Sequence, residues 1–256
     1  MKTKHYLTLA SAALGMAAAT TAQAEDGYDA PAGWPSPVVE YPMTTVRVDR
    51  LEYASPDKGG DALVWDFQAW YGGDFNRLYV EGEGENVQGD GEDAEFESLN
   101  LLYSRLIADF WELQGGIGYQ GGIATNDYPE RYFGVISLLG LAPYRFETDL
   151  DLMISDEGDI SASLESEYNL RLTQRLYLQP RTEIAVAASE VKEFGVGKGL
   201  NSVRVGMRLG YEVTRRFAPY VGAYWEKQYG DTADLSRAGG NNTEDTGVVA
   251  GVRLIF

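Results

Sequence analysis

Residues 144–154 read YRFETDLDLMI, and this stretch alternates between apolar and charged side chains with a period of two. One face of such a strand would carry Tyr144, Phe146, Thr148, Leu150, Leu152 and Ile154, and the other Arg145, Glu147, Asp149, Asp151 and Met153. Alternation of this kind predicts a β-strand. Facing a Lys or Arg towards lipid near the middle of a membrane costs ~2–4 kcal/mol, so the charged face is expected to line the lumen of a barrel.

The same pattern recurs along the chain, clearly in 175–186 and 200–212. Twelve strands are predicted at 45–54, 62–72, 76–85, 95–107, 110–120, 130–140, 144–154, 159–170, 175–186, 200–212, 216–226 and 246–256. Their lengths are close to the ~9–11 residues with which a tilted strand crosses a bilayer. The fold class predicted is therefore all-β, a transmembrane antiparallel outer-membrane β-barrel of twelve strands. Ten strands is the alternative, because 45–54 is the weakest segment and 95–107 and 130–140 do not sort into two faces.

The connections support the barrel because short and long ones alternate. Short connections are predicted at 73–74, 108–109, 142–143, 171–174 and 214–215, and longer ones at 55–61, 86–94, 121–129, 155–158, 187–199 and 227–245. Bacterial barrels have short periplasmic turns and longer outer loops. A soluble β-sandwich would share the alternation, but its outer face should be polar rather than rich in Leu, Val and Tyr.

The N-terminus has the pattern of a cleaved signal peptide over residues 1–24. Lys2 and Lys4 precede an apolar run, and Ala22-Gln23-Ala24 supplies small residues for cleavage. A Pro-rich acidic periplasmic arm at 25–44 and a barrel at 45–256 would follow. No other run of 18 apolar residues occurs, which excludes a helical membrane protein. A secreted chain without cysteine suits the bacterial envelope, and together with the barrel pattern this predicts the bacterial cell outer membrane.

Composition excludes several functions. The chain has 39 acidic and 21 basic residues, a formal charge of −18, so nucleic acid is not an expected partner. There is no cysteine, and the single histidine, His5, would leave with the signal peptide. Nucleophilic catalysis through Ser–His or Cys–His pairs therefore has no base. Carboxylate pairs such as Asp149/Asp151 could serve a hydrolase, but in so acidic a chain we interpret them as lumenal charges, and we expect no enzyme.

The charged faces of the strands predict a lumen that contains both signs of charge. Ion pairs are expected between Arg145, Arg181, Arg204, Arg208 and Arg253 on one side and Glu147, Glu165, Glu167, Glu183 and Glu212 on the other. A small barrel must fill or hydrate its interior, and such pairs would plug it.

Metal binding in this chain would have to use carboxylates and thioethers. A thioether is a soft ligand that suits Cu(I), whereas carboxylates are harder and less selective. Met153 falls on the same strand face as Asp149 and Asp151, so these three are candidate metal ligands. Met43, at the end of the Pro-rich arm, is a fourth candidate. Met207 falls on the apolar face and is expected to contact lipid.

A set of short motifs resembles one known family. The motifs are Trp65-Asp66, Trp70, Gly72-Gly73-Asp74, Asn76-Arg77, Leu102-Tyr103-Ser104-Arg105, Phe110-Trp111-Glu112-Leu113-Gln114, Gly140-Leu141-Ala142-Pro143-Tyr144, Phe146-Glu147, Glu167-Tyr168, Thr173-Gln174-Arg175-Leu176, Leu178-Gln179-Pro180, Tyr211-Glu212 and Phe217-Ala218-Pro219-Tyr220-Val221-Gly222. As an ordered set from about 45 to 256, they resemble the copper-resistance protein B family. The resemblance implies an outer-membrane barrel that handles copper beside periplasmic copper proteins, such as a multicopper oxidase or a copper carrier.

The chain departs from that family at one point. Family members often carry a Met- and His-rich segment ahead of the barrel, whereas residues 25–44 contain only Met43 and no His. Two hypotheses follow. In the first, the barrel binds or passes copper ions at the outer membrane. In the second, a non-transporting barrel with a plugged lumen docks a periplasmic copper-handling partner.

Overall fold

The computed structural model describes residues 41–87, 94–123 and 129–256. The predicted signal peptide, residues 1–24, and residues 25–40 of the predicted arm lie outside the described residues. Within the described ranges, no helix is both long enough and apolar enough to cross a membrane.

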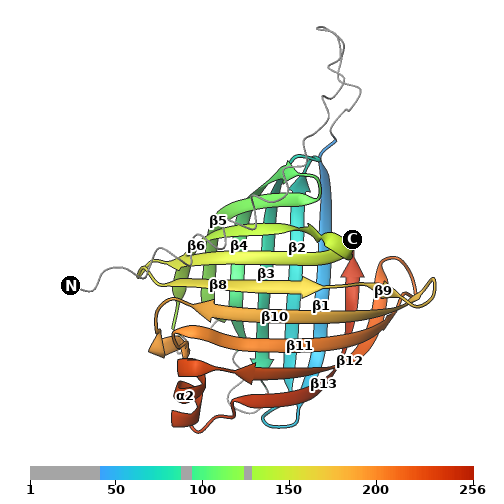
Figure 1. Ribbon diagram of the computed structural model, residues 1–256. Helices are drawn as coiled ribbons and strands as arrows, with labels where there is room; N and C mark the ends of the chain where they lie inside the picture. The colour runs from blue at the N-terminus through green and yellow to red at the C-terminus, as the bar shows by residue number, and fades with distance from the viewer. Residues whose placement is uncertain (1–40, 88–93, 124–128) are drawn as a thin grey trace. The chain divides into compact units, whose positions relative to one another are not determined.

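The described chain forms one antiparallel sheet that closes on itself (Figure 1). Its strands are β1 (Met43–Pro56), β2 (Ala62–Gly72), β3 (Asn76–Val87), β4 (Ala94–Ala108), β5 (Trp111–Ile123), β6 (Arg131–Ala142), β7 (Phe146–Ser155), β8 (Ile160–Glu167), β9 (Leu170–Arg171), β10 (Leu176–Ala187), β11 (Gly199–Tyr211), β12 (Phe217–Gln228) and β13 (Glu244–Ile255). The barrel closes where β13 pairs with β1. Since β8 and the two-residue β9 both pair with β10, they form one interrupted wall strand. The twelve-stranded outer-membrane-type barrel predicted from the sequence is confirmed.

The two faces of β7 sort as the alternation predicts. Leu150, Leu152 and Ile154 are exposed on the outer surface, whereas Asp149 and Asp151 line a cavity inside the barrel. A sheet with an apolar outer face needs an apolar surrounding, and a bilayer supplies it.

Bulges explain why 45–54 is the weakest segment of the pattern and why 95–107 does not sort into two faces. In β1 the register shifts between Val48 and Arg50, and the inward face then includes both Asp49, which lines the cavity, and the buried Arg50. In β4 the register shifts between Phe96 and Leu99, and consecutive residues Glu97 and Ser98 both line the cavity. A bulge adds one residue to a strand and breaks the period of two.

The other unsorted strand, β6, is apolar on both faces because part of the barrel interior is apolar. Phe133 and Val135 point inwards and form a buried cluster with Tyr79 and Leu102. Met153 packs against this cluster. The cluster fills one region of the interior with side chains, and it lies beside the charged cavity rather than within it.

The connection between β6 and β7 corrects one prediction. Tyr144 and Arg145 were expected in the strand, with Arg145 in the lumen, but both lie exposed in the turn with φ of 68°. A chain reversal this short needs left-handed backbone conformations, which end the strand pairing before these residues. Arg145 therefore faces the outside of one rim of the barrel.

The longer connections gather at the other end of the barrel, and one of them contains a helix that the sequence pattern did not indicate. Helix α2 (Gly230–Ala238) follows β12 and packs against β11. Its Thr232 hydroxyl accepts hydrogen bonds from the Gly197 backbone N–H and from Asn201 Nδ2, both 2.8 Å long. By the rule for bacterial barrels, the end with the short turns faces the periplasm.

Candidate functional site

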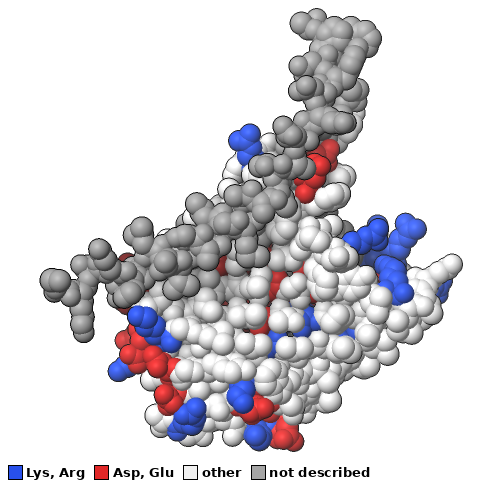
Figure 2. Space-filling view, viewed as in Figure 1, with Lys and Arg blue, Asp and Glu red and all other residues white. Residues whose placement is uncertain are grey.

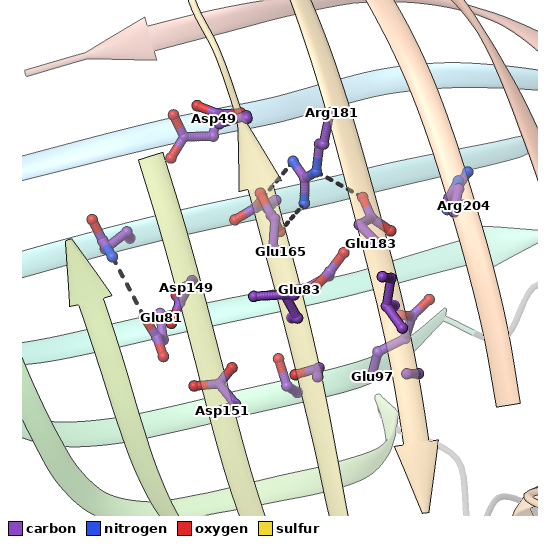
Figure 3. Close-up of a pocket in the computed structure, with 18 of the residues that line it drawn as sticks. Asp49, Glu81, Glu83, Glu97, Asp149, Asp151, Glu165, Arg181, Glu183 and Arg204 are labelled. Carbon is purple, nitrogen blue, oxygen red and sulfur yellow. Dashed lines mark hydrogen bonds and ion pairs between the residues drawn. The ribbon is translucent and has the colours of Figure 1, made fainter. Parts of the chain in front are cut away.

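The barrel interior holds a charged cavity of about 430 Å³ (Figure 3). Its carboxylates are Asp49, Asp66, Glu81, Glu83, Glu85, Glu97, Glu147, Asp149, Asp151, Glu165, Glu167, Glu183 and Glu226, and its basic residues are Arg47, Arg181 and Arg204. These residues come from strands all around the barrel, because every strand presents alternate side chains to the lumen. The lining is therefore strongly acidic.

Two buried arginines cross-link the carboxylates on one side of the lumen. Arg50 is only 2% exposed, and its guanidinium pairs with Asp66 (Nε–Oδ2 3.1 Å), with Glu83, and with Glu183 (Nη1–Oε1 3.6 Å). Arg181 is 5% exposed and pairs with Glu183 (Nε–Oε1 2.7 Å) and with Glu165. These contacts join β1, β2, β3, β8 and β10 across the interior.

A second buried pair joins β11 to β1. Arg208 donates two hydrogen bonds to Glu52, from Nε to Oε2 (3.0 Å) and from Nη2 to Oε1 (2.9 Å), and the Tyr220 hydroxyl donates a third (2.9 Å). The pair spans the intervening strands because two glycines leave room. A Cβ at Gly222 would lie 3.0 Å from Arg208 Cγ, and one at Gly251 would lie 2.7 Å from Glu52 Cβ.

The predicted ion pairs are confirmed only in part. Arg181 pairs with Glu165 and Glu183 as expected. Three other arginines that were expected to pair inside the barrel do so with partners that were not predicted: Arg208 with Glu52, Arg204 with Glu226 (3.8 Å) and Arg253 with Asp49 (3.3 Å).

Glu212 was also expected inside the barrel, and that prediction is wrong. It follows the end of β11 and pairs at the rim with the exposed Arg171, with Nη2 2.7 Å from Oε1. Two further predicted acids, Glu147 and Glu167, line the lumen but accept hydrogen bonds from neutral amides, at 3.2 Å and 2.9 Å.

A second set of lumenal acids, which we call the cation-free group, consists of Glu81, Asp149 and Asp151. No Lys or Arg in the described part of the chain forms an ion pair with any of them. They interact electrostatically with one another and lie near each other in Figure 3. Sequence reasoning selected the two aspartates and missed Glu81, which lies on a distant strand.

The described residues that hydrogen-bond to the cation-free group are all neutral. Glu81 accepts long hydrogen bonds from Asn100 Nδ2 (3.3 Å) and Gln68 Nε2 (3.4 Å). Asp149 accepts one from the Ser137 hydroxyl (2.8 Å). Asp151 Oδ1 is buried and has no hydrogen-bond partner among the described residues. An uncompensated carboxylate away from bulk water is costly, so this group favours a cation from outside the chain.

The predicted metal ligands do not form one compact set. Asp149 and Asp151 share the cavity. Met153, also on β7, packs against the apolar cluster instead of lining the cavity. Met43 is exposed at the first position of β1. Across residues 41–87, 94–123 and 129–256, no three His, Asp or Glu side chains lie in a ready-made arrangement for a metal ion.

A protein-family model matches most of the chain. The model of the family described as "Copper resistance protein B precursor (CopB)" matches residues 42–256. Copper resistance protein B of Escherichia coli is 33% identical over 211 residues, which cover 82% of this chain and 69% of that protein. A Copper resistance protein B homolog of Pseudomonas syringae pv. tomato is 34% identical over 211 residues, covering 81% and 68%.

Comparison with solved structures finds outer-membrane proteins. Outer membrane phospholipase A from Escherichia coli aligns with a TM-score of 0.50 at 11% identity, over 84% of this chain and 94% of that one. A KdgM porin aligns with a TM-score of 0.48 at 10% identity, over 83% and 99%. At such identities the likeness to the phospholipase extends to the barrel fold alone. The family match supplies the identity, and the barrel is that of a bacterial outer-membrane protein: the chain belongs to the copper resistance protein B family.

Proposed function

We propose that this barrel admits copper ions to its acidic lumen and binds or passes them at the outer membrane, without catalysing a reaction. The observation that carries the proposal is the lining of the cavity, where thirteen carboxylates meet three lining arginines and two further arginines, Arg50 and Arg253, that pair with some of them. Such an excess of one sign inside low-dielectric walls concentrates cations. The family supplies the identity of the metal.

The cation-free group is the proposed point of contact. Asp149 and Asp151 would take a cation first, because no arginine competes for them. Met153 lies two residues beyond Asp151 on the same strand face, and by turning from the apolar cluster towards the cavity its thioether would add a soft ligand that suits Cu(I). Met43, at the periplasmic end of β1, would contact the ion as it enters or leaves.

The experiment is a measurement of cell-associated copper by elemental analysis. Cells would express the wild-type chain, the Met153→Leu variant, a double Asp149→Asn, Asp151→Asn variant, or an empty vector. We expect the wild type to change cellular copper relative to the vector, with the sign of the change giving the direction of movement. Both variants should reduce that change, and the double variant should reduce it more.

A titration of the purified barrel with Cu(I) in detergent tests the site directly. Loss of both aspartates should weaken binding by about tenfold or more, since loss of even an outer partner of a metal ligand costs about 10–100-fold. Met153→Leu conserves volume and should cost less than about 1.5 kcal/mol of stability. Met207→Leu is the matched control, because Met207 is exposed on the outer face of β11. Wild-type affinity in the double variant would refute the proposed site.

The second candidate function is that of a non-transporting barrel that docks a periplasmic copper-handling partner, such as a multicopper oxidase or a copper carrier. The cross-links made by Arg50 and Arg181 favour it, because they join strands across the lumen and narrow any path. This alternative predicts unchanged cellular copper in every strain and no copper bound to the purified barrel.

A further inference from the structure

The periplasmic rim carries a set of exposed arginines in three neighbouring turns. We call it the arginine arc: Arg145 before β7, Arg171 and Arg175 before β10, and Arg215 and Arg216 before β12. Arg171 pairs with Glu212. The other four side chains form no ion pair or hydrogen bond with any described residue. These turns follow one another around the barrel, since β7, β8, β10, β11 and β12 are consecutive in the sheet.

The arc is not a consequence of composition, because the chain has a formal charge of −18. Figure 2 shows basic residues without acidic ones among them at the end of the barrel near β9, whereas the opposite end mixes both signs. At that opposite end, Lys192 pairs with Glu190 and Lys227 with Glu244. Lys58 and Lys198 also lie at that end without an ion pair among the described residues, but they stand in separate loops, whereas the unpaired arginines of the periplasmic rim gather in three neighbouring turns.

Large apolar side chains flank each turn of the arc. Tyr144, next to Arg145, is 87% exposed, and Leu172, next to Arg171, is 51% exposed. Phe217, next to Arg216, is also exposed. Aromatic and aliphatic side chains at a barrel rim lie at the boundary between hydrocarbon and headgroups. The adjacent guanidinium groups then lie at the depth of the lipid phosphates.

The backbone of the β6–β7 turn gives an independent indication that the side chains of Tyr144 and Arg145 have a role at this rim. Tyr144 and Arg145 both adopt φ of 68°, in the left-handed region that glycine favours. Residues other than Gly, Asn or Asp adopt this conformation at a free-energy cost. Such strained residues are kept where the surrounding structure or a function requires them. The turn thus keeps an aromatic and a cationic side chain exposed where glycine would be less strained.

We propose that the arginine arc binds the phosphate headgroups of phospholipids in the periplasmic leaflet and prefers anionic lipids. Guanidinium groups bind phosphate oxygens with two parallel hydrogen bonds, which makes arginine well suited to this role. A lipid fits better than an acidic protein, because the apolar residues flanking the arc keep it at the membrane surface. One half of the rim would therefore be fixed to lipid, while the β13–β1 side carries no such cluster among its described residues.

The test uses the purified barrel in detergent, titrated with phosphatidylglycerol or with phosphatidylcholine, and counts bound lipids by native mass spectrometry. The wild type should retain phosphatidylglycerol more tightly than phosphatidylcholine. The triple variant Arg175→Gln, Arg215→Gln, Arg216→Gln should lose about tenfold or more in affinity for phosphatidylglycerol, given the attraction of each basic residue to an anionic surface. The matched control, Lys58→Gln, Lys192→Gln, Lys198→Gln at the opposite end, should keep wild-type affinity.

A second variant separates binding from folding. Arg145→Gly should leave the melting temperature unchanged or raise it, because glycine adopts φ of 68° without strain, and it should still weaken phosphatidylglycerol binding. Equal affinity for the two lipids, or equal loss in the control variant, would overturn the proposal. So would tight, arc-dependent binding of a peptide with the acidic sequence of residues 25–40 without any preference for phosphatidylglycerol, since the arc would then be a protein-binding surface.

Discussion

In one region of the lumen the carboxylates form ion pairs with arginines, and in another they contact neutral groups. Around Arg50 and Arg181, acids from several strands meet guanidinium groups in ion pairs of 2.7–3.8 Å, besides the shorter contacts to Glu83 and Glu165. Around Glu81, Asp149 and Asp151, the partners in the described part of the chain are amides and serine hydroxyls. The first region binds the barrel walls together, and the second has carboxylates that no arginine or lysine of the described chain neutralises.

This difference predicts opposite signs for the same kind of substitution. Removing one member of an enclosed ion pair leaves its partners uncompensated and destabilises the fold. Removing one member of a like-charged set relieves repulsion and should stabilise the fold. Substitutions on the two sides of the lumen therefore test whether the contrast between them is real.

Arg50→Gln should give the largest effect. The side chain is 2% exposed and contacts Asp66, Glu83 and Glu183, so its loss leaves three acids without that cation. Breaking a buried pair costs about 3–5 kcal/mol, and we expect a loss of stability in that range. Urea unfolding of the barrel refolded in detergent micelles, followed by tryptophan fluorescence, measures it.

Arg50→Lys is the control for the Arg50 prediction. It keeps the charge but loses the planar fork that reaches several acids at once, so we expect a smaller loss than for Arg50→Gln. A loss below about 1 kcal/mol for Arg50→Gln, the value of an exposed pair, would mean that water screens the lumen and that its two sides do not differ.

Glu81→Gln should have a smaller effect of the opposite sign. Without its charge, the repulsion from Asp149 and Asp151 falls, and we expect a gain of about 1 kcal/mol in the same unfolding assay. A bound cation stabilises the folded state by mass action. Added copper should therefore raise the stability of the wild type more than that of the variant. Destabilisation by Glu81→Gln would show that its amide contacts outweigh the repulsion.

The sequence predicts the wall of this barrel better than its interior. Alternation places Asp149, Asp151 and Arg181 in the lumen correctly because a strand's faces are a local property. Alternation does not predict that Arg50 and Glu97 face the lumen, because a bulge beside each residue shifts the period of two.

The partner of each lumenal charge is harder to predict than its face. Arg208 meets Glu52 across 156 positions of sequence, and Glu81 on β3 lies near Asp149 on β7. Such contacts depend on the closure of the barrel and on the stagger of its strands. Neither quantity can be read from the pattern of one strand. The soft ligand predicted at Met153 shows the same limit, because its neighbours in the apolar cluster come from β3, β4 and β6.

Asp234→Asn should give the smallest change in the free energy of unfolding, and it serves as the reference for the other substitutions. Arg237 Nη1 lies 2.5 Å from Asp234 Oδ1 on α2, but both side chains are more than half exposed. Exposed pairs contribute about 0–1 kcal/mol, so urea unfolding should detect a change of about 0.5 kcal/mol or less, and added salt should remove it. The pair is shorter than the lumenal contacts of Arg50 with Asp66 and of Arg181 with Glu183, at 3.1 and 2.7 Å, so a small effect here beside a large one at Arg50 would show that enclosure, rather than contact distance, gives the lumenal pairs their strength. A loss of stability comparable to that of Arg50→Gln would instead show that α2 unfolds cooperatively with the barrel.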